Sequence, residues 1–135
     1  MKKREAFTLV ELIIAVFIMA ILAAIAIPIL RGRTEAAAWS EGKAMMGTIA
    51  TAIRAYAAEK DTNGNYGAAL PTPAELGFAD SDLLGTYFGP GNYSWTTTFD
   101  PLANPSLTFT VMATAPAGIT TPPAVTLNHT GSWTP

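Results

Sequence analysis

The sequence contains no cysteine and a single histidine, His129. A chain without cysteine has no disulfide framework, no thiolate metal site and no cysteine nucleophile. No second histidine and no arranged serine and aspartate accompany His129 in a pattern that would suggest catalysis or a metal centre. We therefore interpret His129 as a surface residue and expect no enzymatic activity.

Charge is also scarce. Only 13% of the residues are charged, the formal net charge is -2, and the one basic cluster is the short run Lys2, Lys3 and Arg4. A nucleic-acid-binding surface would be expected to carry an electropositive face, so we expect no nucleic-acid partner. Half of the chain is hydrophobic, which indicates that part of it is solvated by something other than water.

That part is the segment from Leu12 to Leu30. Its nineteen residues include no Asp, Glu, Lys, Arg, His, Asn or Gln, and Glu11 stands at its edge. As a helix the segment would rise about 28 Å, close to the thickness of a bilayer core. We predict one membrane span, whose orientation is only weakly set because Arg31 and Arg33 oppose the three basic residues at the start of the chain.

The helical pattern continues beyond Pro28. Apolar and small residues recur at alternating intervals of three and four, which keeps them on one side of a helix. We predict one long helix from Phe7 to about Lys60, with a kink or melted stretch at Pro28 and Gly32, because proline lacks the N–H that would bond the carbonyl of Ala24. The residues expected to pack this helix onto the rest of the chain are Trp39, Met46, Ile49, Ile53 and Tyr56.

The remainder of the chain changes period. The turn cluster "DTNGNYG" at 61–67 ends the helix, and a short helical piece is expected around Pro73–Gly77 or Ser81–Leu84. Segments rich in threonine, valine and aromatic residues then predict three or four antiparallel strands, including Tyr93–Phe99, Leu107–Ala113 and Ala124–Asn128. The expected fold is therefore α+β: a long N-terminal hydrophobic and amphipathic helix packed on a small antiparallel sheet. The aromatic residues expected in its core are Tyr87, Phe88, Tyr93, Trp95, Phe99 and Phe109.

The stretch "KKREAFTLVELIIAVFIMAILAAIAIP" resembles the N-terminus of type IV pilins and of the pseudopilins of type II secretion. The resemblance lies in the basic leader, the small residue Ala6, Phe7 at the start of the apolar run, Glu11 and Pro28. It implies a pilin-like fold, and it implies that a prepilin peptidase cuts between Ala6 and Phe7 and methylates the new amine of Phe7. Ala6 departs from the glycine that usually precedes the cut in this family.

The resemblance also implies how the chain is organised and what it meets. Residues 1–6 would be a leader removed on processing, 7–30 a transmembrane and filament-core helix, 31–60 its amphipathic second half, and 61–135 the loop and sheet head. The implied partners are the prepilin peptidase, inner-membrane assembly machinery and other copies of the chain in a helical filament. The precursor would reside in the inner membrane, and the product in an extracellular pilus or a periplasmic pseudopilus.

The resemblance also explains why a carboxylate, that of Glu11, stands at the edge of the apolar segment. A charge inside a bilayer costs about 2.5 to 3.5 kcal/mol at the helix centre and less near an end. Cleavage before Phe7 leaves a positive amine four residues away, and in a filament the amine of an adjacent subunit can serve instead. Two charges about 4 Å apart attract by roughly 4 kcal/mol at an effective dielectric near 20, so pairing offsets burial and fixes the register of packed helices. The simpler reading is that Glu11 marks the interfacial start of an ordinary anchor.

Oxygen ligands occur in the loops. Major pseudopilins that resemble this chain bind calcium, which makes Asp80, Asp82 and Asp100 weak calcium candidates, although "DSDLLG" lacks the later ligands of an EF-hand and a solvated loop is the favoured reading. No cofactor is otherwise expected. "NHT" at 128–130 fits a glycosylation sequon, a pattern that often arises by chance.

Three functions remain open. The first is a structural subunit of a type IV pilus, and the second is a pseudopilin of a type II secretion system. The third is a secreted soluble binding domain, because "AIA" at Ala24–Ala26 has the small-x-small form of a conventional signal-peptide cleavage site. N-terminal sequencing separates the third from the others, since the mature chain would begin at Ile27 rather than Phe7.

Overall fold

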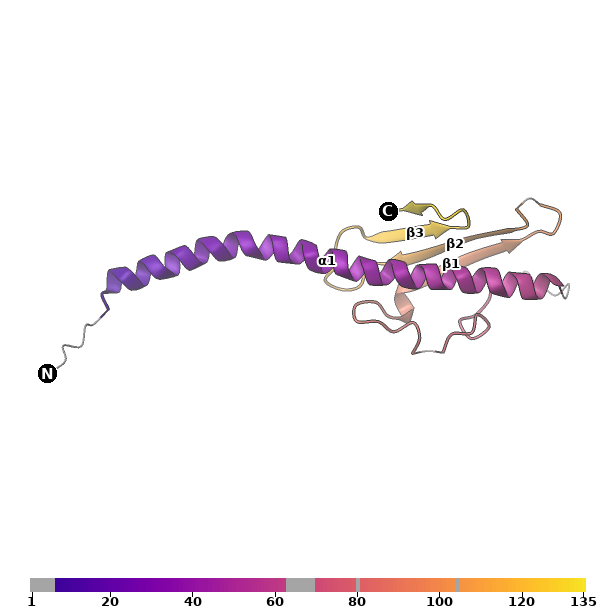
Figure 1. The fold of residues 1–135 in the computed structure, drawn as a ribbon, viewed down its shortest axis with the longest axis horizontal. Helices are drawn as coiled ribbons and strands as arrows, with labels where there is room; N and C mark the ends of the chain where they lie inside the picture. Colours follow the sequence, from indigo (N-terminus) through magenta and orange to yellow (C-terminus); the bar gives the residue numbers. More distant parts are fainter. Residues whose placement is uncertain (1–6, 63–69, 80, 104) are drawn as a thin grey trace. The chain divides into compact units, whose positions relative to one another are not determined.

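A computed structural model describes residues 7–62, 70–79, 81–103 and 105–135. The chain forms a long helix, α1 (Leu9–Thr62), a short 3-10 turn, η1 (Pro90–Asn92), and a four-stranded sheet. Figure 1 shows how the helix and the sheet follow each other along the chain. The strands are β1 (Tyr93–Phe99), β2 (Leu107–Thr114), β3 (Ala124–Asn128) and β4 (Trp133–Thr134). The α+β class predicted from the sequence is confirmed.

The chain divides into two compact units, the first ending at Thr34 and the second running from Glu35 to Pro135. In the first unit every residue from Phe7 to Thr34 is exposed. Among the described residues one helix is long and apolar enough to cross a membrane. Length and composition alone support this membrane-span assignment.

The helix is continuous through Pro28 and Gly32 in the isolated chain. The missing N–H of Pro28 removes one hydrogen bond of the helix, whose remaining bonds on either side are kept. A kink or melted stretch at these two residues therefore stays a prediction about the chain in its assembled or membrane-bound state.

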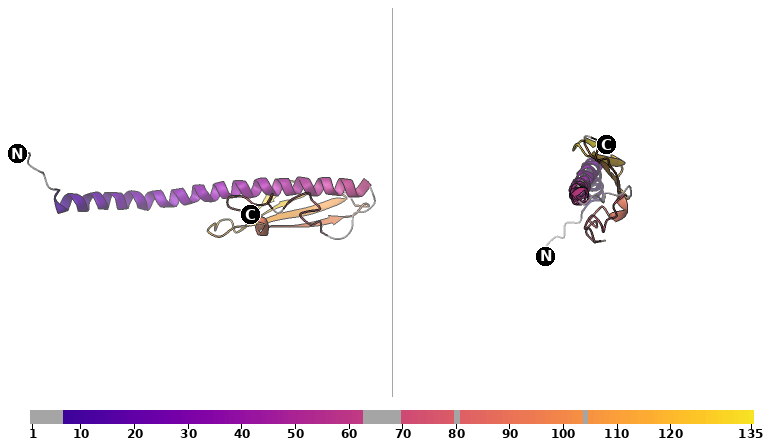
Figure 2. Two further views of the ribbon diagram at one scale, coloured as in Figure 1. Left: turned by 90° about the horizontal axis from the view of Figure 1, so that it is seen from below. Right: turned by 90° about the vertical axis from the view of Figure 1, so that its right-hand side faces the viewer.

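In the second unit the sheet packs against the C-terminal part of α1 as a single layer (Figure 2). The strand order is β1-β2-β3-β4 and all neighbours are antiparallel. Alternation along β2 shows why these residues form a half-buried strand: Phe109, Val111 and Ala113 are buried, whereas Thr110 and Met112 between them are exposed. The core that results consists of Ala38, Trp39, Met46, Ile49, Ala50, Ile53, Leu76, Leu83, Phe88, Tyr93, Phe109, Val111, Ala113, Val125 and Leu127.

The segments expected to hold a short helical piece are turns. The Leu76 N–H donates to the Thr72 carbonyl at 3.1 Å, but Gly77 then adopts a φ of 84°, which ends the coil after one turn. Around Ser81–Leu84 there is only a turn, closed by the Leu84 N–H and the Ser81 carbonyl at 3.2 Å. Helix α1 ends at Thr62, and the rest of the "DTNGNYG" cluster lies outside the described residues.

Candidate functional site

The first turn of α1 is closed by a reciprocal pair, Thr8 and Glu11. Glu11 Oε2 accepts hydrogen bonds from the Thr8 N–H at 2.9 Å and from the Thr8 hydroxyl at 2.8 Å, while the Glu11 N–H donates to Thr8 Oγ1 at 3.3 Å. This is a capping box, whose T-x-x-E spacing is a signal that the sequence carries. The carboxylate of Glu11 therefore already has a local role before any partner amine is available.

The residues of the predicted cleavage site lie at the same end of the chain. Ala6 lies outside the described residues, and Phe7 is 88% exposed. In the uncleaved chain the nitrogen of Phe7 belongs to a peptide bond, so it carries no positive charge to pair with Glu11. A charged amine at this position requires cleavage.

The apolar side chains that follow are exposed around the helix. Even the least exposed of the large ones between Phe7 and Leu30, Ile21, has 48% of its surface open to solvent. A continuous apolar surface of this kind on a monomer marks a contact with lipid or protein. This unit is therefore a candidate site of membrane contact or assembly.

The structure brings the residues of the predicted packing stripe together beneath the sheet. Trp39, Met46, Ile49 and Ile53 are buried in the core, and Tyr56 is partly buried against it. The Lys60 ammonium lies 5.4 Å from the centroid of the Tyr56 ring. These residues thus hold the second half of α1 to the head.

A second anchor, which the sequence analysis missed, is the carboxylate of Glu41 on α1. Its Oε1 accepts the N–H groups of Tyr87 at 3.0 Å and Phe88 at 2.9 Å, and its Oε2 accepts the N–H of Thr86 at 3.1 Å. A Cβ at Gly85 would overlap the Glu41 carboxylate, so glycine lets the loop approach. The N–H of Phe88, followed by those of Tyr87 and Thr86, holds the pKa of Glu41 below its usual range against the opposing effect of burial.

Phe88, which Glu41 positions, lies at the centre of an aromatic cluster. Its ring meets Trp39 edge-on at 5.2 Å and stacks with Tyr93 at 5.8 Å. Burial, and secondarily the charge of Glu41, raises the pKa of Tyr93 to about 12. Of the aromatic residues expected in the core, Phe88, Tyr93 and Phe109 are buried. The prediction that Tyr87 belongs to the core is wrong, because this residue is 44% exposed. Its N–H rather than its ring faces the anchor.

The acidic residues proposed as calcium candidates serve local turns where they are described. Asp82 accepts the Ala79 N–H at 2.8 Å, and Asp100 accepts the Leu102 N–H at 2.9 Å. Asp80 lies outside the described residues. Within the described part of the chain no group of three or more His, Cys, Asp or Glu side chains could hold a metal ion.

The sequon residue Asn128 is likewise engaged in a turn. Its Oδ1 accepts hydrogen bonds from the Thr130 N–H at 3.1 Å, the Thr130 hydroxyl at 2.6 Å and the Ser132 N–H at 2.9 Å. These bonds shape the connection between β3 and β4. The presence of Asn128 at this position is therefore explained by the turn that its side chain stabilises.

Comparison of residues 1–27 with known families gives a match to the model described as the prokaryotic N-terminal methylation motif. Neither the curated proteins nor the solved structures include a match to this chain. The matched residues cover the basic leader, the Ala6–Phe7 junction, Glu11 and the start of the apolar helix. The chain therefore carries, at its N-terminus, the class III signal peptide of type IV pilins, joined to a long apolar helix and a pilin-like α+β head.

Proposed function

We propose that this chain is the structural subunit of a type IV pilus, processed between Ala6 and Phe7 and polymerised through α1. The observation that carries the proposal is the methylation motif at residues 1–27, continued by a helix whose apolar side chains are exposed around its circumference. Exposure of such an apolar surface to water is unfavourable. A bilayer covers it before assembly, and neighbouring copies of the same helix cover it afterwards.

The packing of the head also supports the proposal that the N-terminal part of α1 serves assembly. Among the described residues, the buried core of the head lies between Ala38 and Leu127, and the large apolar side chains from Phe7 to Leu30 are exposed. Those side chains remain free for lipid or for other subunits. The activity of the chain is then polymerisation, and no catalytic group is needed.

Glu11 sets the register in this proposal. Cleavage converts the peptide nitrogen of Phe7 into a cationic amine, and a neighbouring helix at the correct axial offset presents that amine to the Glu11 carboxylate. At any other offset both charges stay unpaired in an apolar environment, where each costs several kcal/mol in order of magnitude. The pair therefore specifies alignment more than it adds stability.

The same motif and helix suit a pseudopilin of a type II secretion system, which remains the second candidate. The two differ in where the fibre ends. Fibres sheared from the cell surface and built from this chain are expected for a pilus, whereas material confined to the periplasm would favour the pseudopilin and overturn the pilus proposal.

The test is electron microscopy of sheared surface material combined with N-terminal sequencing of the mature chain. The expected result is a regular fibre whose subunit begins with N-methylated Phe7. A mature chain that begins at Ile27 and forms no fibre would instead identify a secreted soluble domain, and the proposal would be wrong.

A further inference from the structure

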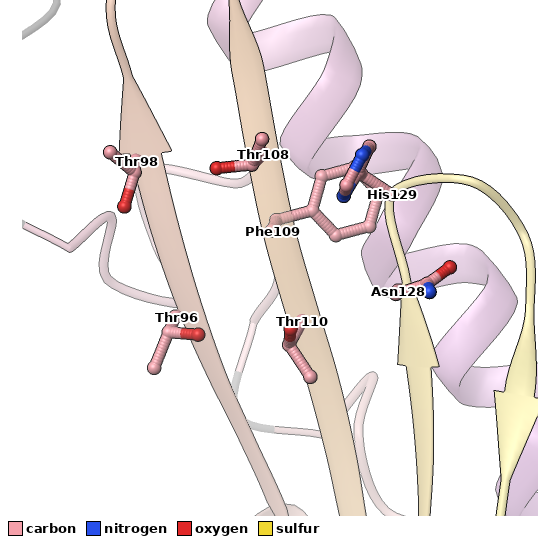
Figure 3. A pocket seen from close by; sticks show the side chains of 7 residues that line it. All are labelled: Thr96, Thr98, Thr108, Phe109, Thr110, Asn128 and His129. Atoms are coloured by element: carbon pink, nitrogen blue, oxygen red, sulfur yellow. The ribbon is translucent and has the colours of Figure 1, made fainter. Parts of the chain in front are cut away.

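An open groove of about 360 Å³ lies on the sheet. Figure 3 shows it from close by, with α1 behind the sheet. Its volume falls at the lower end of the range of small-molecule sites, about 300 to 1,000 Å³. The groove is lined by Thr96, Thr98, Thr108, Phe109, Thr110, Asn128 and His129.

Four threonines form the centre of this lining. The register pairs Thr96 with Thr110 and Thr98 with Thr108 across β1 and β2, so the four side chains stand in two neighbouring rows. In Figure 3 the hydroxyl oxygens of Thr96 and Thr108 point across the space between the two strands. The result is a compact field of hydroxyl and methyl groups.

These hydroxyls differ from others on the same sheet. Thr114 donates to the Asn92 carbonyl at 3.2 Å, and Thr126 donates to the Thr134 carbonyl at 3.3 Å. Within the described residues, the side chains of the four groove threonines make no such bond. Each can therefore both donate to and accept from a ligand.

The end of the groove is held in place from α1. Arg54 donates from Nη2 to the His129 carbonyl at 3.4 Å, and its guanidinium carbon lies 4.9 Å from the centroid of the Phe109 ring. Phe109 in turn meets the His129 ring edge-on at 6.5 Å. The turn bonds of Asn128 described above fix the neighbouring residue, so the wall is ordered before a ligand arrives, which lowers the entropy cost of binding.

The chemistry of the lining selects the ligand. It includes no Asp, Glu, Lys or Arg side chain, so it offers a charged ligand no counter-ion. It offers hydroxyl, amide and imidazole groups together with threonine methyl groups, while the Phe109 ring that also lines it is almost fully buried. We propose that this groove binds a neutral saccharide, whose hydroxyls match the four threonines and whose C–H faces pack against the threonine methyl groups and the His129 ring. The inference goes beyond the filament function and does not depend on it.

The first test uses the full chain in detergent micelles whose detergent carries no sugar headgroup. Threonine methyl groups are labelled with carbon-13, and maltohexaose, cellohexaose and chitohexaose are added separately. We expect at least one of the three to shift the methyl signals of the groove threonines, while those of Thr48 and Thr51 on α1 stay in place. The proposal is overturned if no saccharide shifts the groove signals, or if an uncharged hexapeptide shifts them equally.

The second test removes two of the hydroxyls. The double variant Thr96→Val, Thr110→Val keeps shape and strand propensity and should weaken binding of the active saccharide about tenfold, as expected for two lost hydrogen bonds. Its control, Thr86→Val with Thr121→Val, removes two exposed hydroxyls outside the groove and should leave the dissociation constant unchanged. Equal affinity of the two double variants for the saccharide would contradict the proposal. If the groove variant does not fold, the shifts of the threonine methyl signals in the unaltered chain decide whether the groove binds a saccharide.

Discussion

Glu41 joins two parts of the head that are far apart in the sequence. It is a single carboxylate on α1, and it accepts three consecutive backbone N–H groups from residues 86–88. Hydrogen bonds to a charged acceptor are stronger than neutral ones, and donors left without a partner lose more still. The loop that carries Phe88 into the core is therefore held by charge as well as by packing.

Replacing Glu41 with glutamine tests this anchor. Glu41→Gln keeps the length of the side chain but loses its charge, and we expect the free energy of unfolding of the head to fall by about 1 kcal/mol. The three tryptophans all lie after Thr34, so thermal unfolding in micelles followed by near-ultraviolet circular dichroism reports on the head. The control is Glu35→Gln, since within the described part of the chain Glu35 accepts a single hydrogen bond, from the Thr120 hydroxyl at 3.4 Å. Equal effects of the two variants would show that the anchor is unimportant.

The same carboxylate predicts how stability depends on pH. Glu41 has its pKa held below the ordinary value of 4.5 by the N–H of Phe88, and Glu75 has its pKa held below that value by the Thr72 N–H and hydroxyl. Because the unfolded chain then binds more protons in this range, the stabilisation is complete above the unfolded pKa and is lost as pH falls through the folded one. Unfolding midpoints at about pH 6 and about pH 3 should therefore differ more for the unaltered chain than for Glu41→Gln, Glu75→Gln. Parallel shifts would contradict this assignment.

At the scale of elements, the contact between α1 and Phe88 requires a glycine. A Cβ on Gly42 would lie 2.8 Å from Phe88 Cζ, and the ring cannot easily move because it is packed between Trp39 and Tyr93. On the same helix, a Cβ at Gly47 would meet nothing within 4 Å apart from its own stretch of helix. A substitution at Gly42 therefore changes both packing and helix propensity, whereas one at Gly47 changes helix propensity alone.

Alanine substitutions at these two glycines make the comparison. Gly47→Ala should stabilise the head by up to about 1 kcal/mol, because alanine has the higher helix propensity. Gly42→Ala gains the same propensity but incurs an overpacking cost of about 1 to 3 kcal/mol, so it should be less stable than Gly47→Ala by about that amount. Denaturant titration of both variants measures the difference, and equal stabilities would mean that the Phe88 ring adapts freely.

Elements with local signals could be predicted from the sequence. The spacing of Trp39, Met46, Ile49 and Ile53 predicts the buried side of α1, and the bounds of β1 and β3 agree with the structure. The sequence does not predict β4 as a separate strand, because two residues are too few to show an alternation of apolar and polar side chains. The capping box of Thr8 and Glu11 was readable, since its signal is a fixed spacing.

Contacts of long range could not be predicted in the same way. Glu41 meets its partners 45 to 47 residues later, and those partners are backbone N–H groups, which every residue except proline carries. No residue type in the 86–88 segment signals this use. The groove on the sheet depends on cross-strand register, which places Thr96 beside Thr110 only once the turn between β1 and β2 is known.

At the scale of the whole molecule, Glu11 has two roles that substitution can separate. It closes the first turn of α1 with Thr8, and in the proposed filament its charge pairs with an amine of Phe7. Glutamine can replace glutamate in a capping box, whereas alanine cannot. A variant that keeps the cap and loses the charge therefore isolates the electrostatic role.

Three variants make the decisive set: Glu11→Ala, Glu11→Gln and Thr8→Ala. If charge pairing sets the register, both changes at Glu11 should leave the chain in the membrane but reduce sheared fibre at least tenfold, since loss of about 1.4 kcal/mol in subunit addition is tenfold in its equilibrium constant. Thr8→Ala removes the hydroxyl of the cap but keeps the charge, so it should still assemble. Fibre yield is measured by immunoblot of sheared and membrane fractions. Normal assembly by Glu11→Gln together with failure of Thr8→Ala would assign the role of Glu11 to helix capping and exclude the charge pair as the determinant of register.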